Sequence, residues 1–458
     1  IATKTQLQDL IARIAGGVTS ALQTIKDYAQ LNDKPDPVSP LGVPPTVATY
    51  TAANVTGVSN TIIAAINDAL ATSAITGADV NTTAKIQALV TAYNSIFTLA
   101  DGTANNATAP QAINAATLTL IGVDSTALQA LQNGSSPGSR LALLNSLLDA
   151  QAASGVDRIQ KINKLIDITN AIQELAAGRT TSLTTSLSVA DFATIGVVGV
   201  TAANLTALLT KITTNAATGS DSLPELQNAL YSSISLSFTA ISTDSGYSST
   251  DFITNDKTLT FSGTTTAADG STIKVTLTPA ASGAAQISLT TTATAGIWQV
   301  AYATELLDGF YTVDTELLDG TNSPVQSAAQ ITLTIDTDPN KLPSGAIDTN
   351  LSGKTIAITG ISPDTGTVGD FITNNGQLTI SGTSNADDGA HVAVKINGHT
   401  YTTTVSHGLW SLDNTATTLN VGSYRVEAVL VDSAGNESTS TTKTKDITIV
   451  SAVDLALL

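Results

Sequence analysis

The spacing of apolar residues divides the chain into two halves of different structural class. From Thr3 to about Ser233 the apolar residues recur at steps of three and four positions, which is the spacing of one face of an amphipathic helix. From Ser235 onward the period changes to two, the alternation of a half-buried β-strand. We therefore expect a helical N-terminal half followed by a β-rich C-terminal half.

The helical half repeats itself at long intervals. An apolar residue followed by glutamine recurs at intervals of 79, 73 and 67 residues, at Leu7-Gln8, Ile86-Gln87, Ile159-Gln160 and Leu226-Gln227. A Gly-Val pair lies between successive anchors, and we expect the residue after it to cap the next helix, at Ser59, Asp124 and Thr201. These markers predict three degenerate helical repeats, at residues 1–79, 80–153 and 154–234, the last of which includes a terminal helix.

Glycine and proline punctuate this helical pattern. Gly178 follows the apolar helix that begins near Ile159, so we expect it to form the C-terminal cap of that helix. The segment Asn32–Val47 is rich in proline, which opposes a helix and favours an extended loop. We interpret this segment as a connection between helices and not as a partner-binding motif.

The β-rich half contains the same domain twice. The stretch "DFITN" occurs at Asp251–Asn255 and, 119 residues later, at Asp370–Asn374, and each copy leads into a strand that ends in Ser-Gly-Thr. Further matched pairs are Trp298 with Trp410 and Tyr311 with Tyr424. Each copy reads as short strands separated by turn residues, which predicts an antiparallel β-sandwich. We place the sandwiches at 235–340 and 354–450, with a linker at 341–353 and a tail at 451–458.

Three local features support an immunoglobulin-like sandwich. The single tryptophan of each copy is a candidate for the core. The Gly-x-Tyr-x-Val strands around Tyr311 and Tyr424 have the pattern of a tyrosine corner, in which the ring packs inside and the hydroxyl bonds the backbone. Asn397-Gly398 predicts a two-residue hairpin turn. The expected fold class is therefore multidomain, with helical repeats followed by two tandem immunoglobulin-like antiparallel β-sandwiches.

The composition favours an extracellular structural protein. The 458 residues are long for one core and predict about three to five domains. There is no Cys and no Met, which excludes disulfides and cysteine-based metal sites. Only 12% of the residues are charged, where about 25% is usual for globular domains, and only 4% are aromatic. Thr, Ser, Asn and Ala supply much of the remainder.

The net charge of −18 is concentrated in the β-rich half, where residues 242–458 carry a net charge of −14. An acidic surface repels phosphate, so we expect no nucleic-acid partner. No run of 18 apolar residues occurs, so we expect no membrane span. The chain does not begin with Met and shows no signal peptide, which we interpret as a processed form or a fragment.

The motifs of the second sandwich resemble a known family. The sequence "ISPDTG…DFITNNGQLTISGT…GLWSL…GSYRVEAVLVDSAGNES" is similar to the bacterial immunoglobulin-like repeats of giant, repetitive surface adhesins and biofilm proteins. The resemblance covers about 215 residues. The first copy departs from it at the D-x-A-G-N motif, where it has only Asp319–Asn322. The helical half resembles the Ala-rich helical repeats of similarly long bacterial surface proteins.

The sequence offers little catalytic chemistry. The three histidines, His391, His399 and His407, all lie in the last domain, and the hairpin at Asn397-Gly398 would turn His391 and His399 to opposite faces. We therefore expect no histidine metal site and no Ser-His-Asp triad. No phosphate-binding loop, zinc-protease motif or nucleophile elbow is present, and acid pairs such as Asp387-Asp388 read as solvated turns. We expect a protein that is not an enzyme.

Calcium is the ion that the chain could hold, because Ca²⁺ takes carboxylate, amide and carbonyl oxygens. The resemblance implies that Ca²⁺ stiffens the junctions between sandwiches. The candidate ligands lie in loops at the sandwich ends and between the sandwiches: Asp244, Asp251, Asp336, Asp338, Asp364, Asp370, Asp432 and Asn436. The alternative is that these side chains close turns through their own backbone. The sequence leaves both interpretations open.

Two functional hypotheses follow. The first is a secreted, non-enzymatic bacterial cell-surface protein that serves as an adhesin extender, a surface-layer subunit or a filament subunit. Its partners would be copies of itself or other surface components, and its location would be extracellular. The second is an extracellular module that recognises a glycan or a host protein, which would require a concave or aromatic-rich patch. The sequence shows no such patch.

Overall fold

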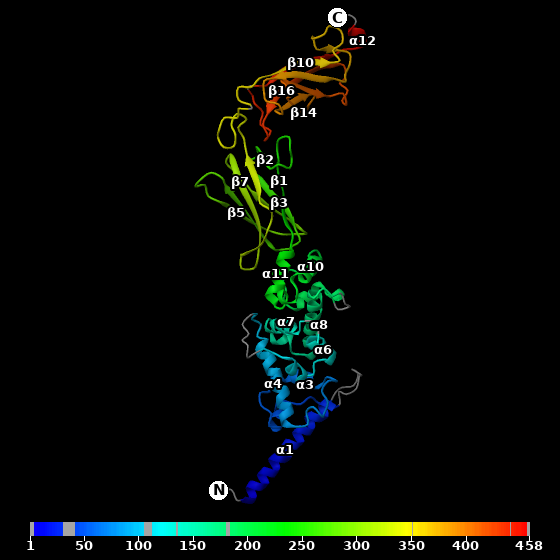
Figure 1. Ribbon diagram of the computed structural model, residues 1–458, viewed down its shortest axis with the longest axis vertical. Helices are drawn as coiled ribbons and strands as arrows, with labels where there is room; N and C mark the ends of the chain where they lie inside the picture. The colour runs from blue at the N-terminus through cyan, green and yellow to red at the C-terminus, as the bar shows by residue number, and fades with distance from the viewer. Residues whose placement is uncertain are drawn as a thin grey trace. The chain divides into compact units, whose positions relative to one another are not determined.

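The computed structural model describes residues 4–30, 42–104, 112–133, 136–179, 184–349, 351–439 and 441–455. It separates into two compact units, residues 1–234 and 235–458. The first unit is helical and the second contains two β-sandwiches, which confirms the predicted fold class (Figure 1). Residues 32–41 of the proline-rich segment and residues 456–458 of the predicted tail lie outside the described residues.

The first unit is built from helices of very different length. The long helices α1, α4 and α8 begin near the first three predicted anchors, and α11 begins near the fourth. The α-helices of this unit are α1 (Lys4–Gln30), α2 (Val47–Ala52), α3 (Ile63–Leu70), α4 (Thr83–Leu99), α5 (Ala115–Leu120), α6 (Ser125–Asn133), α7 (Pro137–Asp149), α8 (Ile159–Ala176), α9 (Val189–Thr194), α10 (Leu205–Asn215) and α11 (Leu223–Ser233). Their apolar faces form the core, in which Tyr50, Tyr93 and Phe192 are fully buried.

The recurring glutamine has a structural role in two of the repeats. Gln87 accepts the N–H of Thr56 through Oε1 at 2.8 Å and donates to the Thr56 carbonyl through Nε2 at 3.1 Å. Gln227 makes the same pair of bonds to Val198, at 2.8 and 2.9 Å. Thr56 and Val198 each precede the glycine of a Gly-Val pair. The glutamine therefore fixes the loop of the preceding segment to the next long helix.

The predicted helix ends are confirmed in part. Asp124 caps α6, because its Oδ1 accepts the N–H groups of Thr126 and Ala127 at 2.8 and 3.0 Å. Gly178 follows α8 with a φ of +71°, as expected for a C-terminal cap. The predicted caps at Ser59 and Thr201 are wrong. Additional turns place the starts of α3 and α10 three to four residues later, so that the N-cap residues are Ile62 and Asn204.

The second unit holds two sandwiches of the same design. In the first, one sheet has the order β1-β3-β6 and the other β2-β9-β7-β4-β5, with β8 paired to β7. The strands are β1 (Leu236–Ile241), β2 (Ile253–Thr254), β3 (Leu259–Thr265), β4 (Thr272–Pro279), β5 (Ile287–Thr292), β6 (Ile297–Tyr302), β7 (Gly309–Leu318), β8 (Pro324–Ser327) and β9 (Ile331–Ile335).

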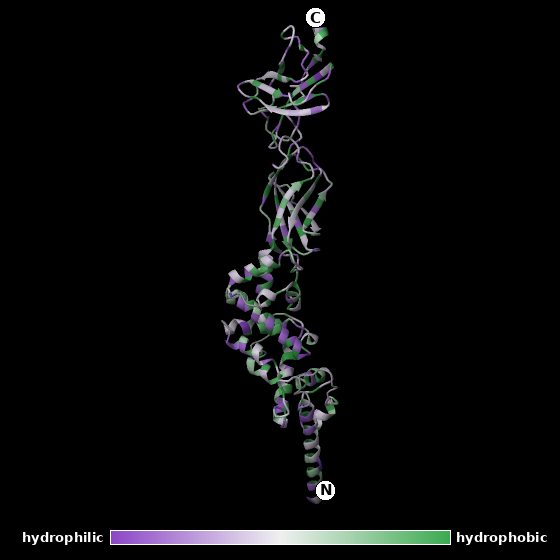
Figure 2. Ribbon diagram, turned by 90° about the vertical axis from the view of Figure 1, so that its right-hand side faces the viewer, coloured by the Kyte–Doolittle hydropathy of each residue, from purple (hydrophilic) through white to green (hydrophobic). Residues whose placement is uncertain are grey.

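The second sandwich has sheets of order β10-β12-β15 and β11-β17-β16-β13-β14. Its elements are β10 (Ile356–Ser362), β11 (Ile372–Thr373), β12 (Thr379–Ser384), β13 (His391–Ile396), β14 (His399–Thr404), β15 (Leu409–Asp413), β16 (Gly422–Val431), β17 (Lys443–Ile449) and the short helix α12 (Ala452–Leu455). Hydrophobic and hydrophilic residues alternate along many of these strands (Figure 2). One face of each sheet thereby reaches the core between the sheets.

The repeated "DFITN" stretch holds the last strand of each sandwich. It forms β2 and β11, which pair in parallel with β9 and β17. Asp251 accepts the N–H of Ile253 at 3.1 Å, and Asp370 accepts the N–H of Ile372 at 2.8 Å. These side chains close the turn that leads into each short strand.

The glycine of each Ser-Gly-Thr ending makes room for the core tryptophan. A Cβ at Gly263 would lie 1.9 Å from the Ser237 carbonyl oxygen and 2.5 Å from the Trp298 ring. The corresponding distances at Gly382 are 1.9 Å from the Ala357 carbonyl oxygen and 2.4 Å from the Trp410 ring. Both tryptophans are buried, at 1% and 2% exposure, so the predicted core role is confirmed.

The tyrosine corners and the hairpin are also confirmed. Tyr311 donates its hydroxyl to the Leu307 carbonyl at 2.8 Å, and Tyr424 donates to the Asn420 carbonyl at 3.1 Å. Asn397 and Gly398 both have positive φ, at 50° and 77°. Ile396 therefore lies opposite His399, and His391 opposite Thr404, as the sequence predicts.

Candidate functional site

Several of the predicted calcium ligands lie where the two sandwiches of the second unit meet. We define the sandwich junction as residues Asp244–Tyr247, Asp336–Asn340 and Asp432–Asn436. Ser245 donates its hydroxyl to the Ala434 carbonyl at 2.6 Å, and Asn436 donates through Nδ2 to the Asp336 carbonyl at 2.8 Å. The intact D-x-A-G-N motif of the second sandwich thus contacts the D-S-G motif of the first.

An aromatic contact accompanies these hydrogen bonds. The Tyr247 and His391 rings stack with their centroids 3.5 Å apart and an angle of 13° between their planes. Burial lowers the pKa of His391 from its ordinary value of 6.5. Burial therefore favours the neutral form of the ring that stacks on Tyr247.

At the junction the Asp336 carboxylate is buried and the Asp432 carboxylate is half-buried. Asp336 is only 5% exposed. Burial first, and then the negative charges of Asp432 and Asp308, raise the pKa of Asp336 to about 6. Burial also raises the pKa of Asp432, although hydrogen bonds from Asn436 oppose the change. Among the described residues, neither Asp336 nor Asp432 forms an ion pair with a basic side chain, whereas the neighbouring Asp338 pairs with Lys341.

The structure places Asn436 between these groups. Its Nδ2 donates to Asp432 Oδ2 at 2.8 Å as well as to the Asp336 carbonyl, and its backbone N–H donates to Asp432 Oδ1 at 2.8 Å. Asp336, Asp432 and Asn436 therefore lie together at the junction, and Asp244 and Asp251 of the predicted set lie near each other within the first sandwich. The D-x-A-G-N motif marked Asp432 and Asn436, and the stretch Asp336–Asn340 marked Asp336, but neither motif indicated that these residues meet.

The other predicted ligands close turns in their own loops. Asp244 accepts the N–H of Phe252 at 3.1 Å, and Asp364 accepts the N–H of Gly369 at 2.8 Å. Asp338 accepts the N–H of Asn340 at 3.0 Å and forms an ion pair of 2.9 Å with Lys341. Within the described ranges, no group of three or more His, Asp or Glu residues lies close enough to hold a metal ion.

The degenerate motif of the first sandwich makes contacts of a different kind. Asp319 Oδ1 accepts the N–H groups of Thr321 and Ser323 at 2.8 and 2.9 Å. The loop thus closes on itself. This loop is the place at which the first copy departs from the D-x-A-G-N motif.

A cavity of about 580 Å³ opens beside the junction in the first sandwich and the following loop. Asp308, Asp336, Asp338 and Lys341 line it, together with Phe310. Asp308 accepts the Thr337 hydroxyl at 2.9 Å. Sequence reasoning missed Asp308, because its only signal was its position shortly before the tyrosine-corner residue.

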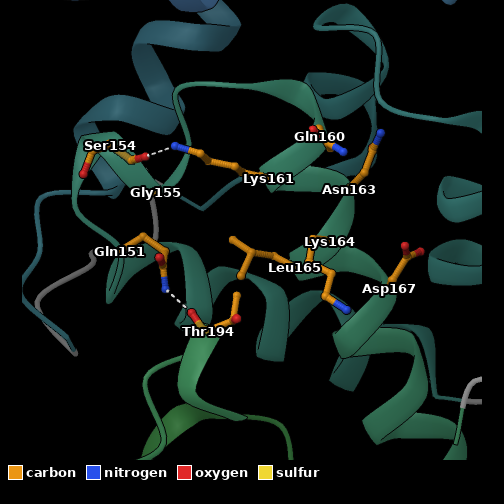
Figure 3. Close-up of a pocket in the computed structure, with 10 residues that line it drawn as sticks. All are labelled: Gln151, Ser154, Gly155, Gln160, Lys161, Asn163, Lys164, Leu165, Asp167 and Thr194. Carbon is orange, nitrogen blue, oxygen red and sulfur yellow. Dashed lines mark hydrogen bonds between the residues drawn. The ribbon is translucent and has the colours of Figure 1, made fainter. Parts of the chain in front are cut away.

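The helical unit contains a second cavity, of about 620 Å³ (Figure 3). Figure 3 shows the Gln151, Ser154 and Thr194 side of the cavity facing residues 160–167 of α8. Lys161 donates to the Ser154 carbonyl at 2.6 Å, and Lys164 forms an ion pair of 2.6 Å with Asp191. The lining residues include no histidine, and the ammonium groups already have partners.

A transmembrane helix is not found either: in the described part of the chain, every helix is too short or too polar to cross a bilayer.

Comparison with known proteins identifies the second unit. Residues 233–337 and 352–449 each match the family model described as Bacterial Ig-like domain. No curated protein shows significant sequence similarity to the chain.

Two solved structures show a distant likeness. One belongs to work on host cell surface retention of a 1.5-MDa bacterial ice-binding adhesin, with 22% identity over 48% of this chain and 64% of that chain, and a TM-score of 0.21. The other contains the FN1–FN3 domains of chicken CNTN1, with 13% identity over 46% of this chain and 66% of that chain, and a TM-score of 0.24. The chain spans less than two thirds of either. Neither TM-score reaches 0.5, so the two likenesses carry no argument about function.

The family match covers the segments in which the sequence repeats its motifs, and the structure folds these segments into two sandwiches with the same strand order. Residues 233–337 and 352–449 are therefore two bacterial Ig-like domains.

Proposed function

We propose that the chain is a non-enzymatic structural protein of the bacterial cell surface, in which the Ig-like domains act as a stiff spacer and the whole chain serves as a building block of an extracellular assembly. The observation that carries the proposal is the sandwich junction. Ser245 and Asn436 bond carbonyls of the opposite sandwich, and Tyr247 stacks on His391. Such contacts restrict the motion that a bare linker would allow.

The stiffness is tested by a distance measurement across the second unit. The chain has no cysteine, so two introduced cysteines carry the only spin labels. Exposed positions suit this purpose, with Ser282→Cys in the first sandwich and Ala416→Cys in the second. We expect a narrow distance distribution by pulsed electron paramagnetic resonance. A broad distribution, like that of two domains on a flexible linker, would overturn the spacer role.

Electron microscopy tests the building-block role. Purified protein on a grid, with and without Ca²⁺, would show lattices or filaments if the chain assembles with copies of itself. Single separate particles in both conditions would leave a spacer that does not self-assemble into an array, and would remove the surface-layer and filament forms of the proposal.

A second part of the proposal concerns calcium. The Asn436 amide lies between two oxygens, the Asp336 carbonyl and Asp432 Oδ2, beside the buried Asp336 carboxylate. A half-turn of this amide would present Oδ1 in place of Nδ2 and complete a set of oxygen donors of the kind that Ca²⁺ prefers. We propose that Asp336, Asp432 and Asn436 hold Ca²⁺ here, and that the ion neutralises the two carboxylates and ties the sandwiches together.

Calorimetric titration of the full chain with Ca²⁺ tests this part. We expect binding that Asp432→Asn weakens at least tenfold, because it removes one of the two charged ligands. The matched control is Asp413→Asn, which changes the same residue type in a turn of the second sandwich outside the junction. Equal binding by both variants would place the ion elsewhere, and no binding by the natural chain would remove the proposal.

A further inference from the structure

The first half of α1 carries an apolar stripe that its own unit does not cover. Leu7, Leu10, Ile11 and Ile14 are 52%, 43%, 58% and 55% exposed. Figures 1 and 2 both show this end of α1 extending beyond the other helices of its unit. Side chains of this size on one face of a helix mark an interaction surface when they are contiguous.

The same positions are buried in the other two long helices. Counted from the recurring anchor pair, Leu7, Leu10 and Ile14 of α1 correspond to Ile86, Leu89 and Tyr93 of α4, which are at most 2% exposed. In α8 they correspond to Ile159, Ile162 and Ile166, which are at most 3% exposed. In both internal repeats this face is therefore covered by other helices. The face of α1 has the same chemistry and is open.

The stripe on α1 has the spacing of a helix-pairing seam. Leu7, Ile11, Ile14 and Val18 follow one another at steps of four, three and four, which is the 3.5-residue period of a coiled coil. The same register continues through Ala21, Ile25 and Tyr28, which are buried against the rest of the unit. The open stripe is thus the direct continuation of an interface that already exists.

The flanks of the seam suit pairing with an identical helix. The positions on either side are Gln8, Leu10, Ala15 and Gly17, none of which is charged. No like charges would therefore face each other when two copies approach. Leu10 widens the apolar surface, and the small Ala15 and Gly17 allow the backbones to approach closely.

From these observations we infer that the Leu7–Val18 stripe of α1 pairs with the same stripe of a second copy of this chain, in a two-helix contact with two-fold symmetry. This pairing rests on the part of the proposed function in which the chain assembles with copies of itself, and it names the surface that would do so. It supplies one defined contact between copies, made by the helical unit and independent of the Ig-like domains.

Sedimentation equilibrium of the full chain, from about 1 to about 200 µM, tests the pairing. We expect a reversible monomer–dimer equilibrium that the triple variant Leu7→Gln, Ile11→Gln, Ile14→Gln weakens by at least tenfold, since each side chain loses the apolar surface it would bury. The variant should keep the thermal unfolding of the natural chain, because these side chains are exposed in the single copy. The matched control is Val198→Gln with Leu307→Gln, which changes apolar side chains that are 74% and 76% exposed elsewhere.

Cross-linking gives an independent reading. Because the chain has no cysteine, a disulfide can form only between introduced residues. A parallel pair would cross-link Ile11→Cys to itself, and an antiparallel pair would cross-link Ile11→Cys to Ile14→Cys when the two variants are mixed. A chain that stays monomeric at every concentration, a dimer that the triple variant leaves unchanged, or the absence of both cross-links would each overturn the pairing. The spin-label test of the spacer role is unaffected by any of these results.

Discussion

Gly246 of the first sandwich packs against Ser433 of the second so closely that no residue larger than glycine fits at position 246. A Cβ at Gly246 would lie 2.1 Å from the Ser433 carbonyl oxygen. Gly246 also has a φ of +93°, which glycine adopts readily and other residues do not. The D-S-G motif of the first sandwich is therefore shaped for contact with the D-x-A-G-N loop of the second.

Gly246→Ala should open the junction without unfolding either sandwich. The variant carries a clash with Ser433 in addition to the backbone strain, which is about 1–2 kcal/mol for a left-handed residue. Hydrogen exchange of residues 433–435 measures the effect, and we expect faster exchange there with little change in the strands. Gly369→Ala is the matched control, because Gly369 has the same φ of +93° and open space at its Cβ. Equal exchange in the two variants would mean that the junction does not depend on this contact.

The glycine beneath each core tryptophan should tolerate substitution by alanine far less well than Gly246 does. Gly382→Ala places a methyl group 2.4 Å from the Trp410 ring and 1.9 Å from a backbone oxygen, so strand β12 must move. We expect the second sandwich to lose about 3 kcal/mol or more of unfolding free energy, at the upper end of the cost of overpacking. Denaturant unfolding followed by tryptophan fluorescence measures this loss. Gly360→Ala, in the same sheet with its nearest neighbour at 3.5 Å, should cost much less.

Asp336 should make the second unit less stable as the pH rises. Its pKa is raised to about 6 in the folded protein, so the folded state holds a proton that the unfolded state has already released. In the absence of divalent cations, this contribution is fully present below about pH 4 and is lost as the pH rises to about 6. Asp336→Asn should remove that slope and raise the melting temperature at pH 7. A melting curve of the variant that keeps the full pH dependence would assign the effect to another group.

Sequence reasoning reached the features that depend on local pattern. The change of period at Ser235, the tyrosine corners and the Asn397-Gly398 turn each follow from residues that are close in the chain. The caps at Ser59 and Thr201 failed, because a hydroxyl after a Gly-Val pair marks a turn as well as a helix start. The cap at Asp124 succeeded because its carboxylate accepts the backbone N–H groups of Thr126 and Ala127 in the first turn of α6.

The sandwich junction was predictable only as a set of candidate oxygens. Which of them meet depends on contacts across about 100 residues, such as that between Asn436 and the Asp336 carbonyl. Nothing in the alternation of a single strand reports such a contact. Asp308 was also missed because its role depends on a contact between distant segments. It lies in the loop that precedes β7 and lines the cavity beside the junction.

The recurring glutamine of the helical unit should contribute measurably to the stability of that unit. Gln87 fixes the Thr56 peptide with two hydrogen bonds, so Gln87→Ala leaves a backbone donor and acceptor without their partner. We expect the helical unit to lose about 1–2 kcal/mol of unfolding free energy, the usual range for two partly exposed hydrogen bonds. Gln8→Ala is the matched control, because Gln8 holds the same position in the exposed first half of α1. Circular dichroism during denaturant unfolding, at a concentration low enough to keep the chain monomeric, compares the two. Similar losses in both variants would show that the glutamine acts through helix propensity, and the clamp on the preceding loop would then have no measurable role.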